Sequence, residues 1–225
     1  MELSLHMLLI VCPLVFLAGF VDSIGGGGGL ISLPAYLFAG LPPHTALATN
    51  KLSSSIGTTI SAVRLFRYMD LPLAGACVLC SLIGSSLGSN LALLASDQLI
   101  RYMLLPVLPI VAYYVLRKKE LNSHEKEPLS QGNTFLVSMP ASFLVGMYDG
   151  FYGPGTGTFL MLVFIHLGKM DTRHAAGGVK VINLASNIGG VCSALMAGTV
   201  VLGVGLAAAL ASILGHYLGA GLAIR

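Results

Sequence analysis

The chain has few charged side chains. Of its 225 residues, 9% are charged and 55% are hydrophobic, and the mean hydropathy is +0.85. A soluble domain of this length needs more charge to cover its surface, so the composition excludes one. Apolar runs of about 20 residues, enough for a helix to span the hydrocarbon layer, recur along the sequence. The composition therefore predicts an all-α polytopic membrane protein whose outer solvent is lipid.

Other absences remove classes of function. The formal net charge of +3 offers no basic surface to a nucleic acid. No G-K-[ST] follows a glycine cluster, and no H-E-x-x-H or pair of carboxylates lies on one helical face. We therefore expect no enzyme, no cofactor and no nucleic-acid partner.

The metal-binding residue types are sparse. Cys77 and Cys80 form one C-x-x-C without a second pair, which favours small core residues over a metal site. His44, His166 and His174 stand at the ends of apolar segments without ligand spacing. We expect interfacial or capping roles for these histidines, and no metal.

The apolar segments predict helices, and one charged stretch separates them into two series. The opening segment lacks the basic region and cleavage site of a secretory signal, so we count it as a mature helix. The expected helices are 5–24, 30–41, 45–66, 71–94 and 98–116, then 134–151, 156–168, 172–197 and 200–224. The linker 117–133 between the series carries charges of both signs and is expected to be cytoplasmic.

The two series are related repeats, 1–116 and 134–225. Residues 79–92 and 210–223 align without gaps, with seven of fourteen pairs identical. Both copies contain G-x-x-x-G, which we interpret as close helix packing in lipid. The first half continues to Leu116, whereas only two residues follow Ala223. We therefore expect the second repeat to lack its last helix, through truncation or because a partner, such as a second copy, covers that face.

Basic residues predict the orientation of the repeats. If they all face the cytoplasm, the helices at 45–66 and 172–197 run in opposite directions across the membrane, and the repeats are inverted. The cations used are Arg64, Arg67, Arg117, Lys118, Lys119, Lys126, Lys169, Arg173 and Arg225.

Each repeat contains a glycine-rich break beside an aspartate. Asp22 precedes five glycines at 25–29, and Asp149 precedes the glycine-rich run 153–157. Open backbone is costly in hydrocarbon unless protein or a wet cavity surrounds it, and its N–H groups can bind an anion. The helices after the breaks are short, so we expect broken or re-entrant helices. A tight hairpin turn is the alternative; Gly27, Gly28, Gly155 and Thr156 are the candidate anion contacts.

Each break is followed by a helix with a lysine-headed polar stripe. Lys51, Ser54 and Thr58 share one face, and Lys180, Asn183 and Asn187 repeat that spacing, with Asn50 beside the first lysine. Placing a lysine at membrane depth costs roughly 3 kcal/mol on insertion scales, so a buried lysine is expected to have a charge partner or a function. We expect these residues to bind substrate, with Asp22 and Asp149 as charge partners or carriers of a coupled proton. A purely structural Lys–Asp pair and a lysine that snorkels to the surface are the alternatives.

These motifs resemble the sulfite exporter TauE/SafE family over nearly the whole chain. The resemblance is carried by the glycines at 25–29 with Pro34, the stretch 46–52, the run 148–159 and the stretch 180–187. It implies a multi-pass, bacterial-type inner-membrane permease that exports small sulfur-containing or carboxylated anions, driven by an ion gradient. The resulting hypothesis is a secondary transporter with alternating access between two repeats. A non-transporting assembly subunit and a passive anion channel are the rival functions.

Overall fold

A computed structural model describes residues 4–117 and 129–223, and its regular elements there are all helical. The all-α fold class is therefore confirmed. The helices are α1 (Leu5–Gly25), α2 (Gly29–Phe38), α3 (Pro43–Leu65), η1 (Phe66–Tyr68), α4 (Leu71–Leu94), α5 (Asp97–Arg117), α6 (Gln131–Phe151), α7 (Thr156–Leu162), the π-helical η2 (Val163–Leu167), α8 (Thr172–Met196) and α9 (Leu202–Ala223). Most of the expected linker lies outside the described residues, and its last three positions, 131–133, form the start of α6.

Helix length separates spanning from short elements. Within the described residues, α1, α4, α8 and α9 are long and apolar enough to cross a membrane. The ten residues of α2 extend only about 15 Å at 1.5 Å per residue, roughly half of a hydrocarbon layer. Large apolar side chains such as Leu94 and Met196 lie exposed on the outside of the bundle. That arrangement suits a protein surrounded by lipid.

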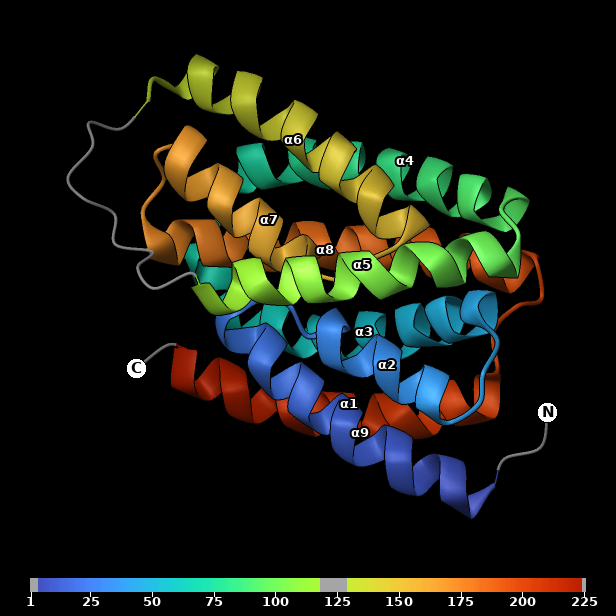
Figure 1. The fold of residues 1–225 in the computed structure, drawn as a ribbon. Coiled ribbons are helices and arrows are strands. Elements are labelled where there is room, and N and C mark those ends of the chain that lie inside the picture. The colour runs from blue at the N-terminus through green and yellow to red at the C-terminus, as the bar shows by residue number, and fades with distance from the viewer. Residues whose placement is uncertain (1–3, 118–128, 224–225) are drawn as a thin grey trace.

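Six helices pack side by side in the order α6, α4, α8, α3, α9 and α1, and lie roughly along one direction (Figure 1). The outer pairs, α4 with α6 and α1 with α9, pack through their G-x-x-x-G motifs. A Cβ added at Gly84 would collide with the backbone of Phe143, and one added at Gly215 would collide with that of Phe16. The expected close packing is confirmed, and both outer pairs join one half of the chain to the other.

The two central helices, α3 and α8, run antiparallel. A Cβ at Gly177, near the start of α8, would lie 3.0 Å from the carbonyl oxygen of Leu65, the last residue of α3. A Cβ at Gly190, farther along α8, would lie 3.1 Å from Cδ of Lys51, nearer the start of α3. Small residues on α8 thus allow close contact with α3 along its length.

His44 and His174 lie at the starts of α3 and α8, where they bind aspartates, in line with the expected capping role. Asp171 is the N-cap of α8, and its carboxylate accepts the N–H groups of Arg173 at 3.0 Å and His174 at 3.1 Å. Partial burial raises the pKa of Asp171, but the hydrogen bonds from His174 outweigh it and hold this pKa below its ordinary value. His44 binds the Asp97 carboxylate at 2.5 Å. Both histidines therefore serve helix ends.

The described residues contain no cluster of three His, Cys, Asp or Glu side chains that would hold a metal ion. Cys77 is buried in the core as expected, whereas Cys80 is only half-buried, because it lies at a different angle around α4. The C-x-x-C pair is thus a core residue and a partly exposed neighbour.

Candidate functional site

The two glycine breaks meet in the interior of the bundle. Gly26 adopts a φ of +78° immediately after α1, a conformation that L side chains rarely adopt. A Cβ there would also lie 2.7 Å from the backbone nitrogen of Thr158, in the other half of the chain. The Thr158 hydroxyl donates to the carbonyl of Gly25 at 3.4 Å. The opened main chain of one half therefore lies directly against that of the other.

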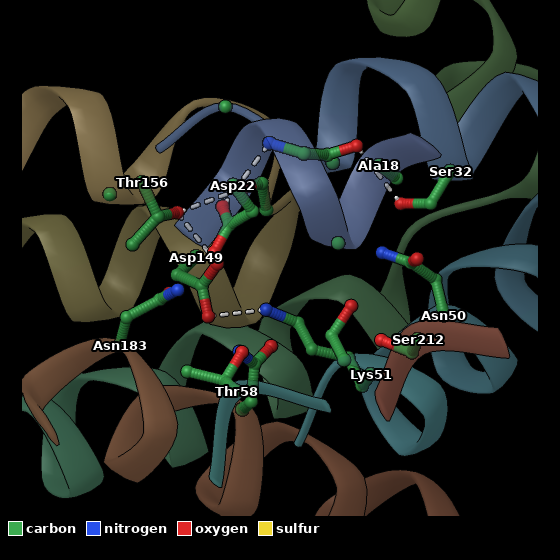
Figure 2. A pocket seen from close by; sticks show the side chains of 18 of the residues that line it. Ala18, Asp22, Ser32, Asn50, Lys51, Thr58, Asp149, Thr156, Asn183 and Ser212 are labelled. Carbon is green, nitrogen blue, oxygen red and sulfur yellow. Dashed lines mark hydrogen bonds and ion pairs between the residues drawn. The ribbon is translucent and has the colours of Figure 1, made fainter. Parts of the chain in front are cut away.

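Two buried lysines pair with aspartates across the halves. Lys51 of α3 binds the carboxylate of Asp149 in α6, as Figure 2 shows, and Lys180 of α8 binds that of Asp22 in α1 at 3.0 Å. Lys180 also donates to the main-chain carbonyl of Asp22. The lysine side chains are 7% and 4% exposed. Snorkelling is therefore wrong for both lysines, since each ammonium group is held by an aspartate inside the protein.

The Asp149 carboxylate is fully engaged. Its Oδ1 accepts the hydroxyl of Thr156 at 2.6 Å, and its Oδ2 accepts Lys51 and the hydroxyl of Ser186, the latter at 2.6 Å. Thr156 is the first residue of α7, so the helix after the break contributes to holding the charge. The arrangement neutralises the carboxylate with one cation and two neutral donors.

The Asp22 carboxylate has a related but different set of neighbours. Its Oδ1 accepts the backbone N–H of Gly28 at 3.2 Å, so this amide of the first break binds the protein's own carboxylate. Its Oδ2 accepts Lys180 and lies 3.5 Å from Nε2 of His216 on α9. Here an imidazole stands in the place that a serine hydroxyl occupies beside Asp149.

One cavity connects these groups, and Figure 2 shows its lining side chains. The expected residues that line it are Asp22, Gly27, Gly28, Asn50, Lys51, Ser54, Thr58, Asp149, Gly155, Thr156, Asn183 and Asn187. Of the residues predicted from the sequence, only Lys180 is missing from the lining; its ammonium group binds the carboxylate and the main-chain carbonyl of Asp22. The geometry thus assembles both breaks and both polar stripes around a single space.

Sequence reasoning missed three polar residues of this cavity: Ser32, Ser212 and His216. Ser212 and His216 lie in the repeated segment 210–223, which was interpreted only as a packing motif. The signal was present, since His216 replaces Ser85 in an otherwise similar repeat. A buried histidine where the other copy has serine marks a chemical difference between the halves.

Comparisons with known proteins identify the family of the chain. The family described as Sulfite exporter TauE/SafE matches residues 11–225. A probable membrane transporter protein of Haemophilus influenzae is 36% identical over 98% of this chain and 86% of its own length. The probable membrane transporter protein ORF9 of a Sinorhizobium species is 34% identical over 97% of this chain and 84% of its own length.

A third relative, the probable membrane transporter protein YfcA of Escherichia coli K12, is 34% identical over 93% of this chain and 76% of its own length. No solved structure matches the chain significantly. The long apolar helices and these relatives together identify a multi-pass membrane protein. The chain belongs to the sulfite exporter TauE/SafE family of membrane transporters.

Proposed function

We propose that the protein is a secondary transporter that exports small anions, such as sulfite, sulfonates or related organic acids, across a bacterial inner membrane. The observation that carries this proposal is the cavity between the two glycine breaks, where a buried lysine of each half pairs with an aspartate of the other. Intramembrane ionisable residues are expensive and mark transport pathways. Broken helices that expose backbone amides beside such residues are typical of transporter binding sites.

The lining chemistry supports a small polar anion as substrate. Asn183 and Asn187 bring amide groups to the cavity, and Ser54 and Thr58 bring hydroxyl groups from the facing helix. Amide N–H and hydroxyl groups donate to oxyanions without adding a fixed charge, so the ion can still leave. The family name and the relatives' names agree with transport but do not specify the ion for this chain.

Two recesses support alternating access by inverted repeats. One recess is lined by His44, Leu47, Ala92, Gly150 and Ala194, and the other by Arg173, Ala176, Ala223, Ser23 and Leu65. These residues correspond one by one when Lys51 is aligned with Lys180, Asp22 with Asp149, and 79–92 with 210–223. The recesses lie at opposite ends of the antiparallel α3 and α8. We infer that each is the access route from one side of the membrane.

Counterflow in proteoliposomes tests the function. A carrier loaded with unlabelled sulfite accumulates labelled sulfite against its gradient; a passive channel does not, and an assembly subunit moves nothing. We expect accumulation with sulfite or a small sulfonate. Its absence with sulfite, sulfonates and carboxylates alike would refute the proposal.

A variant links that transport to the cavity. Replacing Asn183 with alanine removes a donor to the anion, and a hydrogen bond to a charged group contributes about 1.5–3 kcal/mol, or roughly 10–100-fold in transport efficiency. Asn90→Ala is the matched control, because Asn90 is exposed on α4 and donates to the carbonyl of Ser86. Equal transport by Asn183→Ala and Asn90→Ala would exclude Asn183 from the site.

A further inference from the structure

The charges around the cavity cancel before any substrate enters. Lys51 and Asp149 form one ion pair, and Lys180 and Asp22 form the other, so these four groups have a formal sum of zero. An anion that enters leaves the water and meets two carboxylates as well as two lysines. Binding it in a low-dielectric interior requires a further positive charge. The lysines alone do not supply it, because each is already neutralised.

His216 is the remaining titratable group in the lining of this cavity among the described residues. The residue is 3% exposed, and its Nδ1 lies 2.9 Å from the carbonyl oxygen of Ser212 on the same helix. A carbonyl only accepts, so Nδ1 carries the hydrogen in this contact. Nε2 of a neutral imidazole then presents a lone pair. That atom has no hydrogen-bond partner and lies 3.5 Å from Oδ2 of Asp22.

A neutral His216 therefore places a lone pair against a carboxylate. A proton on Nε2 converts this repulsive contact into a charge-assisted donor contact and adds one positive charge to the cavity. Histidine is the side chain that exchanges a proton most readily near neutral pH. Nε2 of His216 is therefore positioned to bind a proton beside the Lys180–Asp22 ion pair.

The surrounding helices form a slot for the imidazole. A Cβ at Gly19 of α1 would lie 2.6 Å from Nδ1 of His216, and one at Gly57 of α3 would lie 2.7 Å from it. In the aligned repeat, Gly19 corresponds to Gly146, which is also a glycine, but Gly57 corresponds to Ser186. Because Gly19 and Gly57 have no side chains, the His216 ring fits between them. The aligned position in the other half has Ser186 in place of the second glycine.

The charged groups that face His216 come from three helices. Asp22 approaches from α1, and Lys180 of α8 binds the same Oδ2 of that carboxylate that lies near His216. Lys51 of α3 lines the same cavity, held by Asp149. Arg64 of α3 instead binds the carbonyl of Tyr217 near the exposed side of α9. Asp22 is thus the group that senses protonation of His216 most directly.

We propose that His216 is the site of a coupled proton, so that one proton binds at Nε2 together with one substrate anion. This inference rests on the proposed transport function and assigns its coupling ion. Because proton and anion move in the same direction, export follows the outward gradient of the substrate, and an imposed proton gradient drives uptake. The protonated Nε2 donates a hydrogen bond to the Asp22 carboxylate in place of Lys180. The Lys180 ammonium group can then bind the anion. When the anion leaves, the proton leaves Nε2 and the Lys180–Asp22 pair closes again. The hydroxyl of Ser186 beside Asp149 cannot titrate, so the second pair stays fixed.

Proteoliposomes with an entrapped pH dye test the coupling, using labelled methanesulfonate as the probe. We expect an imposed proton gradient to raise wild-type uptake at least tenfold, and added methanesulfonate to move protons with it. His216→Gln and His216→Ser, the residue at the aligned position 85, should lose both effects, and counterflow should weaken because the cavity then lacks the added positive charge. His166→Gln is the control, because His166 is exposed and its Nδ1 bonds to the carbonyl of Leu162 on its own helical turn. Proton flux that persists in both His216 variants would overturn the proposal.

A second measurement separates this inference from the proposed function. The melting temperature of the purified protein between pH 5 and 8 reports proton binding without any transport. We expect His216→Gln and His216→Ser to change this profile, and His166→Gln to keep it. If the wild-type protein transports nothing but the pH dependence of its melting temperature requires His216, the proton site is supported and the transport function is refuted. If transport occurs and the profile is the same without His216, the proton site fails.

Discussion

The strongest energetic prediction concerns the ion pair between Lys51 and Asp149. Its side chains are 7% and 3% exposed, so the cost of a buried pair applies, not the small value of a surface pair. Removing one partner of a buried pair costs about 3–5 kcal/mol. Lys51→Met leaves the carboxylate with the hydroxyls of Thr156 and Ser186, so we expect about 3 kcal/mol. Asp149→Asn leaves a buried ammonium group, so we expect about 5 kcal/mol.

A double-mutant cycle isolates the pair. The double variant Lys51→Met/Asp149→Asn removes both charges, so its cost should fall below the sum of the singles by up to about 3 kcal/mol. The assay is reversible unfolding in mixed micelles, with the exposed pair of Asp171 and His174 as control, where about 0–1 kcal/mol is expected. Strict additivity at the buried pair would refute the reasoning, because it would mean that the two charges do not interact.

Three further predictions concern close backbone approach and pH. Gly26→Ala should lower the free energy of unfolding by at least about 1–2 kcal/mol, because φ is positive and the other half leaves no room, whereas Gly25→Ala, with open space, should change it little. Gly88→Ala should weaken the packing of α4 on α6, and Gly75→Ala, on the same helix with open space, should not; thermal unfolding of both variants measures the difference. Asp171→Ala removes the N-cap of α8 and should cost about 1 kcal/mol at pH 6. Since the folded pKa of this carboxyl lies below its ordinary value, that deficit should shrink as pH falls below about 4; a deficit that is equal at pH 6 and pH 3 would contradict the hydrogen-bonded cap.

The helices were predictable because lipid makes each one satisfy its own backbone. Without water to bond exposed N–H and C=O groups, an apolar run of sufficient length must be helical, so the ends of α4 at Leu71 and Leu94 were predicted to the residue. The breaks were equally visible, since glycine clusters beside an aspartate stand out in an apolar sequence. The polar stripes followed from the helical period, which places residues three and four apart on one face.

The partner of each lysine was not predictable from these local signals. Lys51 and Asp149 are 98 positions apart, and Lys180 and Asp22 are 158 apart, so either lysine could have taken either aspartate. The choice follows from which helices lie together, and that is decided by the small-residue faces that bring α4 against α6 and α1 against α9. The replacement of Ser85 by His216 in the aligned segment marked this residue as unusual, but its contact with Asp22 depends on the packing of α9 against α1.

The amino-acid sequence alone predicted a helical membrane protein with two glycine-rich breaks, because composition, helical period and glycine runs act locally along the chain. Folding brings both breaks to one cavity, pairs each lysine with an aspartate of the opposite half, and places a histidine at one of the two ion pairs. Those properties depend on contacts between distant segments. Their energies arise from burial and charge in the assembled interior, which no stretch of sequence contains alone.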